Sequence, residues 1–450
     1  MNEDNQLSNS KSSKSKAILY AMPRCGSSIV LGIEGLALFT LYTIGYGVSP
    51  FLVGFALAMG YLSIAASQFL LGWISDAKYT RFGRRKPWII LITPLLGISF
   101  ILLLLPALFL PDLNDKSALF FWLLIWEIIF RVSYGMTTPY QSWAAEQFEV
   151  SERPMVSQFQ NTFNWIGNGV MLIFSLVILT GVFEKIQNNP NVIPPEFLIP
   201  TILFGIIVVG LFYLLVFLMP TEPEFKIDSS LSANLKTILK NKNYVLTTLM
   251  RGITGIALSM TIAIIITYGL VVLRLSGTDF IIIAGILLLC IMFFLYVWRK
   301  LIQKKGKKQT LLYIFILGIV FLPISLFGLI PMDSYLILGI IFISGIGAIL
   351  GGWFLFPYLL DADMAEDDEK STGELKAGIY VGFPSILLNI FQALGVFILG
   401  VILILPNITV GSASFSIGLI IWGPICSAIL IISYIFTKRL LTFDFEWENK

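Results

Sequence analysis

Long apolar segments alternate with short polar segments along almost the whole chain. An α-helix needs about 20 consecutive apolar residues to cross the hydrocarbon core of a bilayer. The chain has twelve segments of this kind. They centre on residues 28–46, 51–74, 88–110, 118–140, 158–182, 197–219, 245–273, 278–298, 310–330, 334–360, 376–405 and 413–437. The pattern therefore predicts an all-α membrane protein with twelve transmembrane helices.

One polar stretch is longer than the others and divides the twelve segments into two groups of six. It contains two prolines, several acids and four lysines, and such a mixture is typical of a linker. The sequence therefore predicts an N-terminal tail, a six-helix bundle, a linker, a second six-helix bundle and a C-terminal tail. Their expected bounds are 1–24, 25–219, 220–244, 245–437 and 438–450.

The composition agrees with a chain that lies in a bilayer. Charged residues make up 13% of the chain and hydrophobic residues 57%, whereas soluble domains carry about 25% charged residues. Histidine is absent, which excludes catalysis, metal binding and proton relay by that side chain. Cys25, Cys290 and Cys426 are widely separated, so we expect no disulfide framework, metal site or cofactor.

The distribution of basic residues predicts the orientation in the membrane, because lysine and arginine in short loops favour the cytoplasmic side. Of the 30 basic residues, 25 fall in the tails and in the even-numbered loops. The odd-numbered loops carry only Lys116, Lys185 and Arg274. We therefore expect an integral protein of the plasma membrane with both termini in the cytoplasm. The net charge of +3 then reflects topology and not a nucleic-acid surface.

A basic turn lies between the second and third apolar segments. It reads Gly72-Trp73-Ile74-Ser75-Asp76 and then Arg81-Phe82-Gly83-Arg84-Arg85-Lys86-Pro87. Glycine allows close helix approach and a tight turn, and arginine cannot enter lipid without compensation. Two further segments complete the pattern: Pro139-Tyr140, Glu146 and Glu152-Arg153 after the fourth apolar segment, and Asp363, Glu366, Glu369, Thr372-Gly373 and Gly378 after the tenth.

These three segments resemble the major facilitator superfamily, and within it the glycoside-pentoside-hexuronide:cation symporters and their sucrose-transporter relatives. The resemblance implies two six-helix bundles around a central cavity. It also implies a secondary transporter and not an enzyme. Such a protein is expected to act as a monomer in contact with membrane lipids and a small-molecule substrate, with a coupling proton as a further candidate partner and with no nucleic-acid partner.

The basic and acidic segments predict an ionic gate between the ends of the two bundles. Charges of opposite sign would pair when that side closes and separate when it opens. The alternative is that these charges are only solvated, because exposed ion pairs are typically worth about 0–1 kcal/mol. The candidate gate residues are Asp76, Arg81, Arg84, Arg85, Arg153, Asp363, Glu366 and Glu369.

The second helix lacks the carboxylates with which the resembling symporters bind their cation, since the equivalent positions are Ile64, Gln68 and Phe69. Several positions that bind substrate in melibiose-type members are uncharged and polar here. Uncharged polar groups suit a neutral sugar, because each sugar hydroxyl needs a donor and an acceptor. The alternative is that they only form hydrogen bonds between helices. The predicted substrate-binding residues are Ser28, Gln68, Arg131, Thr137, Gln141, Asn161, Trp353 and Asn389.

Four charged residues fall inside the predicted helices: Glu34, Glu127, Arg131 and Arg251. Ionisable residues at membrane depth are costly and indicate function. Glu127 and Arg131 lie four positions apart on one helix face, so they can neutralise each other as a purely structural pair. Glu34 has no evident local partner. We therefore predict that Glu34 carries a coupling proton, with Glu127 as the second candidate.

The sequence thus predicts a secondary active transporter that moves a neutral sugar or glycoside by alternating access, with symport of a proton. Three alternatives stay open: a sugar uniporter, a transporter of an amphiphile such as a lysolipid, and a receptor that does not transport. A receptor would be expected to carry a sizeable soluble domain, and this chain has only short tails and one linker.

Overall fold

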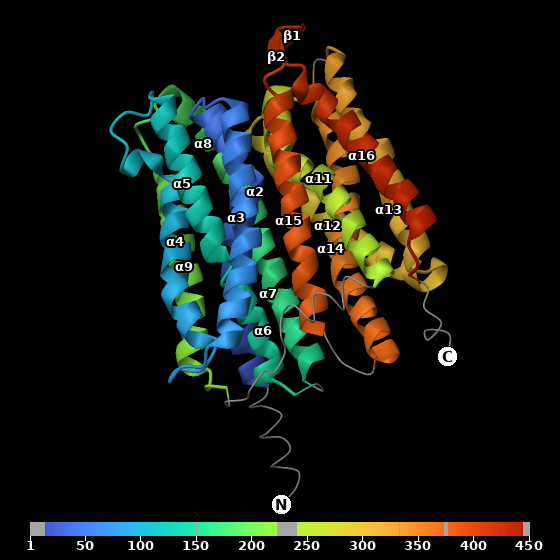
Figure 1. The fold of residues 1–450 in the computed structure, drawn as a ribbon. Helices are drawn as coiled ribbons and strands as arrows, with labels where there is room; N and C mark the ends of the chain where they lie inside the picture. The colour runs from blue at the N-terminus through green and yellow to red at the C-terminus, as the bar shows by residue number, and fades with distance from the viewer. Residues whose placement is uncertain (1–13, 150–151, 223–240, 333, 373–376, 444–450) are drawn as a thin grey trace, which may run out of the picture.

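The computed structural model describes residues 14–149, 152–222, 241–332, 334–372 and 377–443, with backbone only at residues 77, 145, 357–358, 361–372 and 377–383. Within these ranges twelve helices are long and apolar enough to cross a membrane. They form two bundles that stand side by side (Figure 1). The twelve-helix, two-bundle architecture predicted from the apolar segments is confirmed.

The N-terminal bundle contains the first six spans, and three of these spans change helix type or bend along their length. The first span runs from Lys14 to Gly45, and the fourth and fifth spans each join two α-helices. The elements are α2 (Pro23–Thr40), η1 (Leu41–Gly45), α3 (Pro50–Ala77), α4 (Lys86–Leu104), η2 (Pro106–Leu108), α5 (Lys116–Tyr134), α6 (Thr137–Gln147), α7 (Arg153–Ile173), η3 (Phe174–Ile178), α8 (Leu179–Asn188) and α9 (Pro195–Leu218).

The C-terminal bundle contains the other six spans and one short β-hairpin, which the sequence did not predict. Strands β1 and β2 pair antiparallel, with Asn407 opposite Ser416. The elements are α11 (Lys242–Val271), α12 (Gly277–Lys305), α13 (Lys307–Phe321), η4 (Leu322–Leu329), α14 (Leu336–Thr372), α15 (Ala377–Ile402), β1 (Asn407–Val410), β2 (Ala413–Ser416) and α16 (Gly418–Leu440).

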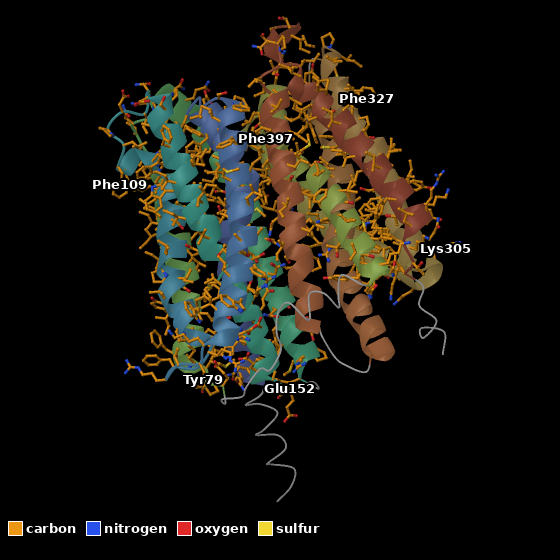
Figure 2. All side chains as sticks on the ribbon, in the orientation of Figure 1. Tyr79, Phe109, Glu152, Lys305, Phe327 and Phe397 are labelled. Carbon is orange, nitrogen blue, oxygen red and sulfur yellow. The ribbon has the colours of Figure 1, made fainter. Side chains whose placement is uncertain are left out.

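The two ends of the bundles are named here by what they carry. The hairpin face holds β1 and β2, at the top of Figure 1. The basic-turn face is the opposite end and holds residues 78–85, which connect α3 to α4. Tyr79 and Glu152 mark the basic-turn face in Figure 2.

Local sequence signals explain where several helices begin. The side chain of Asp115 accepts hydrogen bonds from the backbone N–H groups of Ser117 and Ala118 and so caps α5. Ser276 and Asp279 form a reciprocal capping box at the start of α12. Each cap satisfies backbone donors that have no partner in the first turn of a helix. Both caps lie at the hairpin face, where the chain re-enters the bundle.

The first span begins earlier than the sequence predicted. Residues up to 24 were expected to form a tail, but the chain is already helical from Lys14. Contacts to the fourth span hold this extension: Lys16 donates to the carbonyl O of Gln147 at 2.6 Å, and the rings of Tyr20 and Tyr140 stack with centroids 5.0 Å apart. Tertiary packing therefore extends the helix beyond its apolar segment.

The acidic segment after the tenth span is helical and not a loop. Helix α14 is described to Thr372, and its last part, residues 358–372, contains neither Gly nor Pro. A segment without either residue can continue a helix. The backbone positions of Asp363, Glu366 and Glu369 therefore lie on α14, while their side chains lie outside the described residues. Most of the predicted linker, residues 223–240, also lies outside them.

The two bundles pack closely near the hairpin face. A side-chain carbon placed on Gly54 of α3 would lie 2.7 Å from the carbonyl O of Val396 and 2.9 Å from the Cα of Gly400, both on α15. The hydroxyls of Thr40 and Thr267 lie 2.8 Å apart across the same interface. At this contact the helices approach backbone to backbone, which only glycine allows.

We expect Gly54→Ala to favour a state in which the hairpin side is open. The added methyl group meets backbone atoms, which cannot move aside as a flexible side chain would. A clash of this kind costs about 1–3 kcal/mol, which would shift the closed-to-open ratio by roughly 5- to 150-fold. The measurement is the distance between spin labels on cysteines that replace Asp112 and Ser334, both exposed near this face, in a background without the native cysteines.

Gly181→Ala in α8 is the matched control, because a side-chain carbon there would have no neighbour within 4 Å. It should leave the distance distribution unchanged. If Gly54→Ala also left the distribution unchanged, the glycine contact would have no part in closing this side.

Candidate functional site

Three charged residues form a buried cluster within the N-terminal bundle. The guanidinium of Arg131 donates from Nη2 to Glu34 Oε1 at 2.6 Å and from Nε to Glu127 Oε1 at 3.0 Å. The exposed fractions of the three residues are 3%, 1% and 0%. The structure therefore joins Glu34, on α2, to the pair that the spacing on α5 predicted. Glu34 has no local partner, as the sequence indicated, and its partner Arg131 comes from another helix, 97 positions away in sequence.

Helix α3 completes the cluster with two neighbouring residues. The ring of Tyr61 faces the guanidinium of Arg131, with 4.0 Å between the guanidinium carbon and the ring centroid, which is a cation–π contact. Gly60 leaves space for a carboxyl group, since a side-chain carbon there would lie 2.7 Å from Cγ and 2.8 Å from Cδ of Glu127. Sequence reasoning did not identify either residue, because neither carries a charge.

The cluster lies deep in the bundle. Tyr61 lies 11 residues from the start of α3 at Pro50, and Glu127 lies 11 residues from the start of α5 at Lys116. At 1.5 Å per residue this is about 16 Å from the hairpin end of each helix, close to the middle of a core about 30 Å thick. Among the described residues, Glu34 Oε2 and Glu127 Oε2 have no hydrogen-bond partner. The described residues contain no group of three His, Cys, Asp or Glu that could hold a metal ion.

Some of the predicted substrate-binding residues pair with polar groups on other helices. Asn389 on α15 donates from Nδ2 to Gln68 Oε1 on α3 at 3.3 Å, so this pair crosses between the two bundles. Ser28 on α2 donates to Asn164 Oδ1 on α7 at 2.5 Å. Both contacts fit the alternative in which such residues connect helices, and the contact of Asn389 with Gln68 also places polar groups where the bundles meet.

The other predicted substrate-binding residues have different surroundings. Thr137 is buried, and its hydroxyl donates to the carbonyl O of Tyr134 in its own span at 2.9 Å. Gln141 and Asn161 are exposed. Trp353 is half-buried and borders a small cavity inside the C-terminal bundle, beside Thr254. The structure therefore does not gather the predicted residues into one compact site.

Helix α7 carries a row of amides that the sequence analysis used only in part. It is polar for a membrane helix, and the exposed residues of its first half include Gln158 and Asn161. Trp165 on the same helix packs edge-on against Phe354 of α14, with ring centroids 6.2 Å apart. Amides in a membrane helix need water or polar partners. Asn164 accepts from Ser28 and Gln160 donates to Tyr140, whereas the exposed Gln158 and Asn161 are open to water or a polar ligand. The amides are Gln158, Gln160, Asn161, Asn164 and Asn168.

A second ionic site organises the basic-turn face. Arg85 donates from Nη2 to Glu146 Oε1 at 2.6 Å, pairs with Asp76 Oδ1 at 2.5 Å and donates from Nη1 to the hydroxyl of Ser75 at 2.7 Å. Only 4% of Arg85 is exposed. Side chains of its own bundle hold the guanidinium. The acidic segment of the other bundle, which is the predicted partner of Arg85, has no described side chains, so that contact stays a prediction.

The remaining gate candidates make local contacts. Arg81 is exposed and lies over the ring of Phe82 at 4.7 Å. Arg153 donates from Nε to the carbonyl O of Phe148 at 3.4 Å. Arg84 is buried. Because the acidic side chains of α14 lie outside the described residues, the gate between the bundles stays a prediction.

Glu222 is the residue at this face that sequence reasoning missed. Its Oε1 accepts hydrogen bonds from the backbone N–H groups of Arg84 and Arg85, and its Oε2 accepts one from Trp143 Nε1 at 2.9 Å. Gly83, with φ 93°, leaves room for this carboxylate. Only 1% of Glu222 is exposed. Glu222 lies in the predicted linker, where an acidic residue is expected to be exposed to water. No sequence signal indicates that it is buried.

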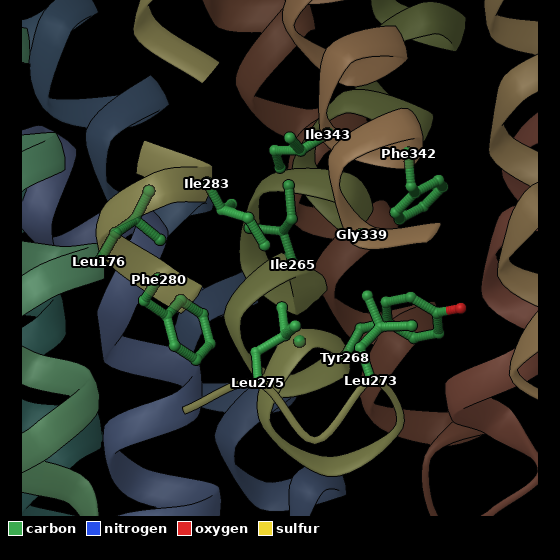
Figure 3. A pocket seen from close by; sticks show the side chains of 11 residues that line it. Leu176, Ile265, Tyr268, Leu273, Leu275, Phe280, Ile283, Gly339, Phe342 and Ile343 are labelled. Carbon is green, nitrogen blue, oxygen red and sulfur yellow. The ribbon is translucent and has the colours of Figure 1, made fainter. Parts of the chain in front are cut away.

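An apolar cavity lies near the hairpin face between α11, α12 and α14, with Leu176 of η3 from the other bundle at its edge (Figure 3). Tyr268 brings the single hydroxyl of its lining, and this hydroxyl donates to the carbonyl O of Ser325 at 2.9 Å. The lining therefore suits an apolar group and not a sugar hydroxyl.

Comparisons with known proteins agree with this architecture. A family model described as MFS/sugar transport protein matches residues 16–429. A 150-residue segment is 30% identical to sodium-dependent lysophosphatidylcholine symporter 1 of Gallus gallus. That segment spans 31% of this chain and 26% of the relative, so the match covers about a quarter of the relative's length.

Solved structures share the fold at low sequence identity. A D-xylose-proton symporter superposes with a TM-score of 0.66 at 13% identity, over 95% of this chain and 97% of the other. The nucleoside transporter NupG gives 0.61 at 13% identity, over 94% and 99%. A bacterial homologue of the human lysosomal transporter Spinster, inward-facing and unoccupied, gives 0.63 at 10% identity, over 95% and 96%. At these identities the likeness shows the fold alone.

Proposed function

The chain belongs to the MFS/sugar transport protein family, and from this premise we propose that it moves a neutral sugar or glycoside by alternating access, with symport of a proton. The family match over most of the chain confirms the resemblance that the three sequence segments predicted, and it makes the protein a transporter and not an enzyme. The substrate class and the coupling are the parts that we propose.

The buried cluster of Glu34, Glu127 and Arg131 carries the proposal of coupling. Ionised groups at membrane depth cost several kcal/mol each unless they are paired. A chain that moved its substrate without coupling would need no carboxylate there. Glu34 lies on α2, which packs against α11 of the other bundle. A change in the charge of Glu34 therefore affects the energy of the interface that moves during alternating access.

The amides of α7 and the pair of Gln68 and Asn389 support a neutral polyhydroxylated substrate. Amides offer both donors and acceptors, as sugar hydroxyls require. Gln68 and Asn389 come from different bundles, so a substrate that replaced their mutual hydrogen bond would contact both halves. Of the two buried arginines in the described spans, Arg131 already pairs with two carboxylates and Arg251 is also engaged, so neither is free for an anionic substrate.

A lysolipid is the second candidate. The relative from Gallus gallus is named as a lysophosphatidylcholine symporter, and the lining of the small cavity in Figure 3 is apolar, as contact with an acyl tail requires. The short match and the polar face of α7 weigh against this candidate, which is why we place the sugar first.

We further propose that the basic-turn face is cytoplasmic and that the protein acts as a monomer in the plasma membrane. The charge distribution of the loops supports this orientation. We keep the predicted bounds of the two bundles, the linker and the C-terminal tail. The N-terminal tail is the exception, because the first helix begins at Lys14 and not after residue 24.

The test is uptake of labelled neutral disaccharides and of labelled lysophosphatidylcholine into proteoliposomes, with and without an inward proton gradient. We expect the gradient to drive accumulation of a disaccharide above equilibrium. Glu34→Gln should abolish that accumulation while it leaves exchange of labelled for unlabelled sugar, because exchange needs no net proton movement. Glu196→Gln, an exposed carboxylate of α9, is the matched control and should behave as the wild type.

Two outcomes would change the proposal. Equilibration of sugar without any response to the gradient would mean uniport. Movement of the lysolipid but of no sugar would replace the proposed substrate class by the second candidate.

A further inference from the structure

We infer that Glu34 and Glu127 act as one site that holds a single shared proton, with Arg131 bridging the two carboxyl groups. The inference rests on the proposed function and deepens it, since it assigns the coupling ion and the number of ions. It also differs from the individual roles predicted for Glu34 and Glu127, because neither residue alone carries the proton.

The geometry of the two carboxyl groups supports sharing. Each group uses Oε1 to accept a hydrogen bond from Arg131, and each has an Oε2 without a partner among the described residues. Both Oε1 atoms lie against the same guanidinium, at 2.6 Å and 3.0 Å, so the two carboxyl groups are neighbours. Two ionised carboxylates have no donor to offer one another, whereas a protonated carboxyl can donate to an ionised one. The contact therefore requires at least one proton in the pair.

The charge balance of the cluster also indicates a single bound proton. With both carboxyls ionised, two negative charges and one positive charge leave a net charge of −1 in a cluster that is at most 3% exposed. Burying an unbalanced charge is costly. One added proton makes the cluster neutral, and a second would leave Arg131 without an ionised partner. Of the other titratable groups nearby, Tyr61 faces Arg131 from α3, and Tyr42 donates its hydroxyl to the carbonyl O of Leu103.

The site is poorly suited to a metal cation. Hard cations such as calcium and magnesium take six or more oxygen ligands, whereas the cluster offers two unpartnered carboxylate oxygens. The guanidinium of Arg131 lies against both carboxyl groups, and its positive charge would repel a second cation. A proton needs no coordination shell, so it fits where a sodium ion would lack ligands.

Helix α3 contributes space and a ring where its relatives are expected to contribute carboxylates. Where the resembling symporters carry cation-binding carboxylates, this chain has Ile64 and Gln68. Gly60 and Tyr61 of the same helix instead lie against the buried cluster. Gly60 is needed because any side chain would displace the carboxyl group of Glu127. This arrangement lets the coupling site lie between α2 and α5 with α3 as its support.

Infrared difference spectroscopy of the purified protein tests the inference without a substrate. We expect a protonated-carboxyl band at neutral pH that corresponds to one group per chain. Glu34→Gln and Glu127→Gln should each remove the whole band, because the remaining carboxyl then pairs with Arg131 as a full ion pair. Persistence of the band in either single variant would assign the proton to the other residue alone and overturn sharing.

Two further arms keep the result clear. Replacing choline chloride by sodium chloride should leave the band unchanged, and its loss on addition of sodium would overturn the assignment of the ion.

Gly60→Ala keeps all three charged groups but displaces Glu127, so the band should be weakened or shifted. Gly210→Ala in α9 is its control, since a side-chain carbon there meets nothing within 4 Å. Because no substrate is used, failure of the sugar assignment would leave this result interpretable.

Discussion

Arg131→Ala is expected to destabilise the protein more than any other single change in the N-terminal bundle. The substitution removes the cation that bridges Glu34 and Glu127. Both buried carboxyl groups then lose their hydrogen bond from Arg131. Removal of one partner from a buried ion pair typically costs about 3–5 kcal/mol. We expect a large fall in the midpoint of thermal unfolding in detergent, and loss of transport.

Compensating variants separate the lost charge from lost packing. Arg131→Lys keeps a positive charge but not the two-sided geometry of the guanidinium, so it should recover part of the stability. Arg131→Ala combined with Glu34→Gln and Glu127→Gln should be more stable than Arg131→Ala alone, because no buried charge is left. If the triple variant were no more stable than the single one, the cost would come from packing against Tyr61 and not from charge.

The twelve helices could be predicted because each span carries its own signal, a run of about 20 apolar residues, which does not depend on the rest of the fold. The helix ends could not be predicted in the same way. The start of the first span depends on Lys16 and Tyr20 packing against the fourth span, and the extension of α14 runs through acids that a hydropathy pattern assigns to a loop.

The same distinction applies to the buried cluster. Glu127 and Arg131 could be paired from sequence because four positions on one helix form a local relationship. Glu34 joins them only because α2, α3 and α5 pack together, and no local pattern carries that information. Gly60 could not be predicted for a further reason. It contributes space for Glu127 because it has no side chain, and the sequence alone does not reveal which neighbour fills that space.

At the basic-turn face the sequence identified the charged residues but not their partners. Opposite charges in two loops suggested a contact between bundles, because the sequence gives the sign of each charge and not its burial. The structure places Arg85 inside its own bundle and brings Glu222 in beside it. Both acids that hold the turn, Glu146 and Glu222, reach it through the fold of the chain and lie more than 60 positions away.

Glu222→Ala is expected to have the second-largest effect. The substitution removes the acceptor of three donors, the backbone N–H groups of Arg84 and Arg85 and the indole N–H of Trp143. A buried donor left without a partner costs about 1–3 kcal/mol. Because water can enter near this face, we expect a total loss on the order of 3 kcal/mol in the free energy of unfolding. Hydrogen exchange at Arg84 and Arg85 should also become faster.

The two oxygens of Glu222 can be tested separately because they have different donors. Glu222→Gln keeps one carbonyl oxygen for the two backbone N–H groups, and its amide N–H₂ then faces the indole N–H of Trp143, so only the indole bond is lost. Trp143→Phe removes the donor of that same bond. The double variant should therefore keep the slow exchange at Arg84 and Arg85. Fast exchange in Glu222→Gln would mean that the negative charge of Glu222, beside the N-terminus of α4, holds the turn more strongly than its hydrogen bonds do.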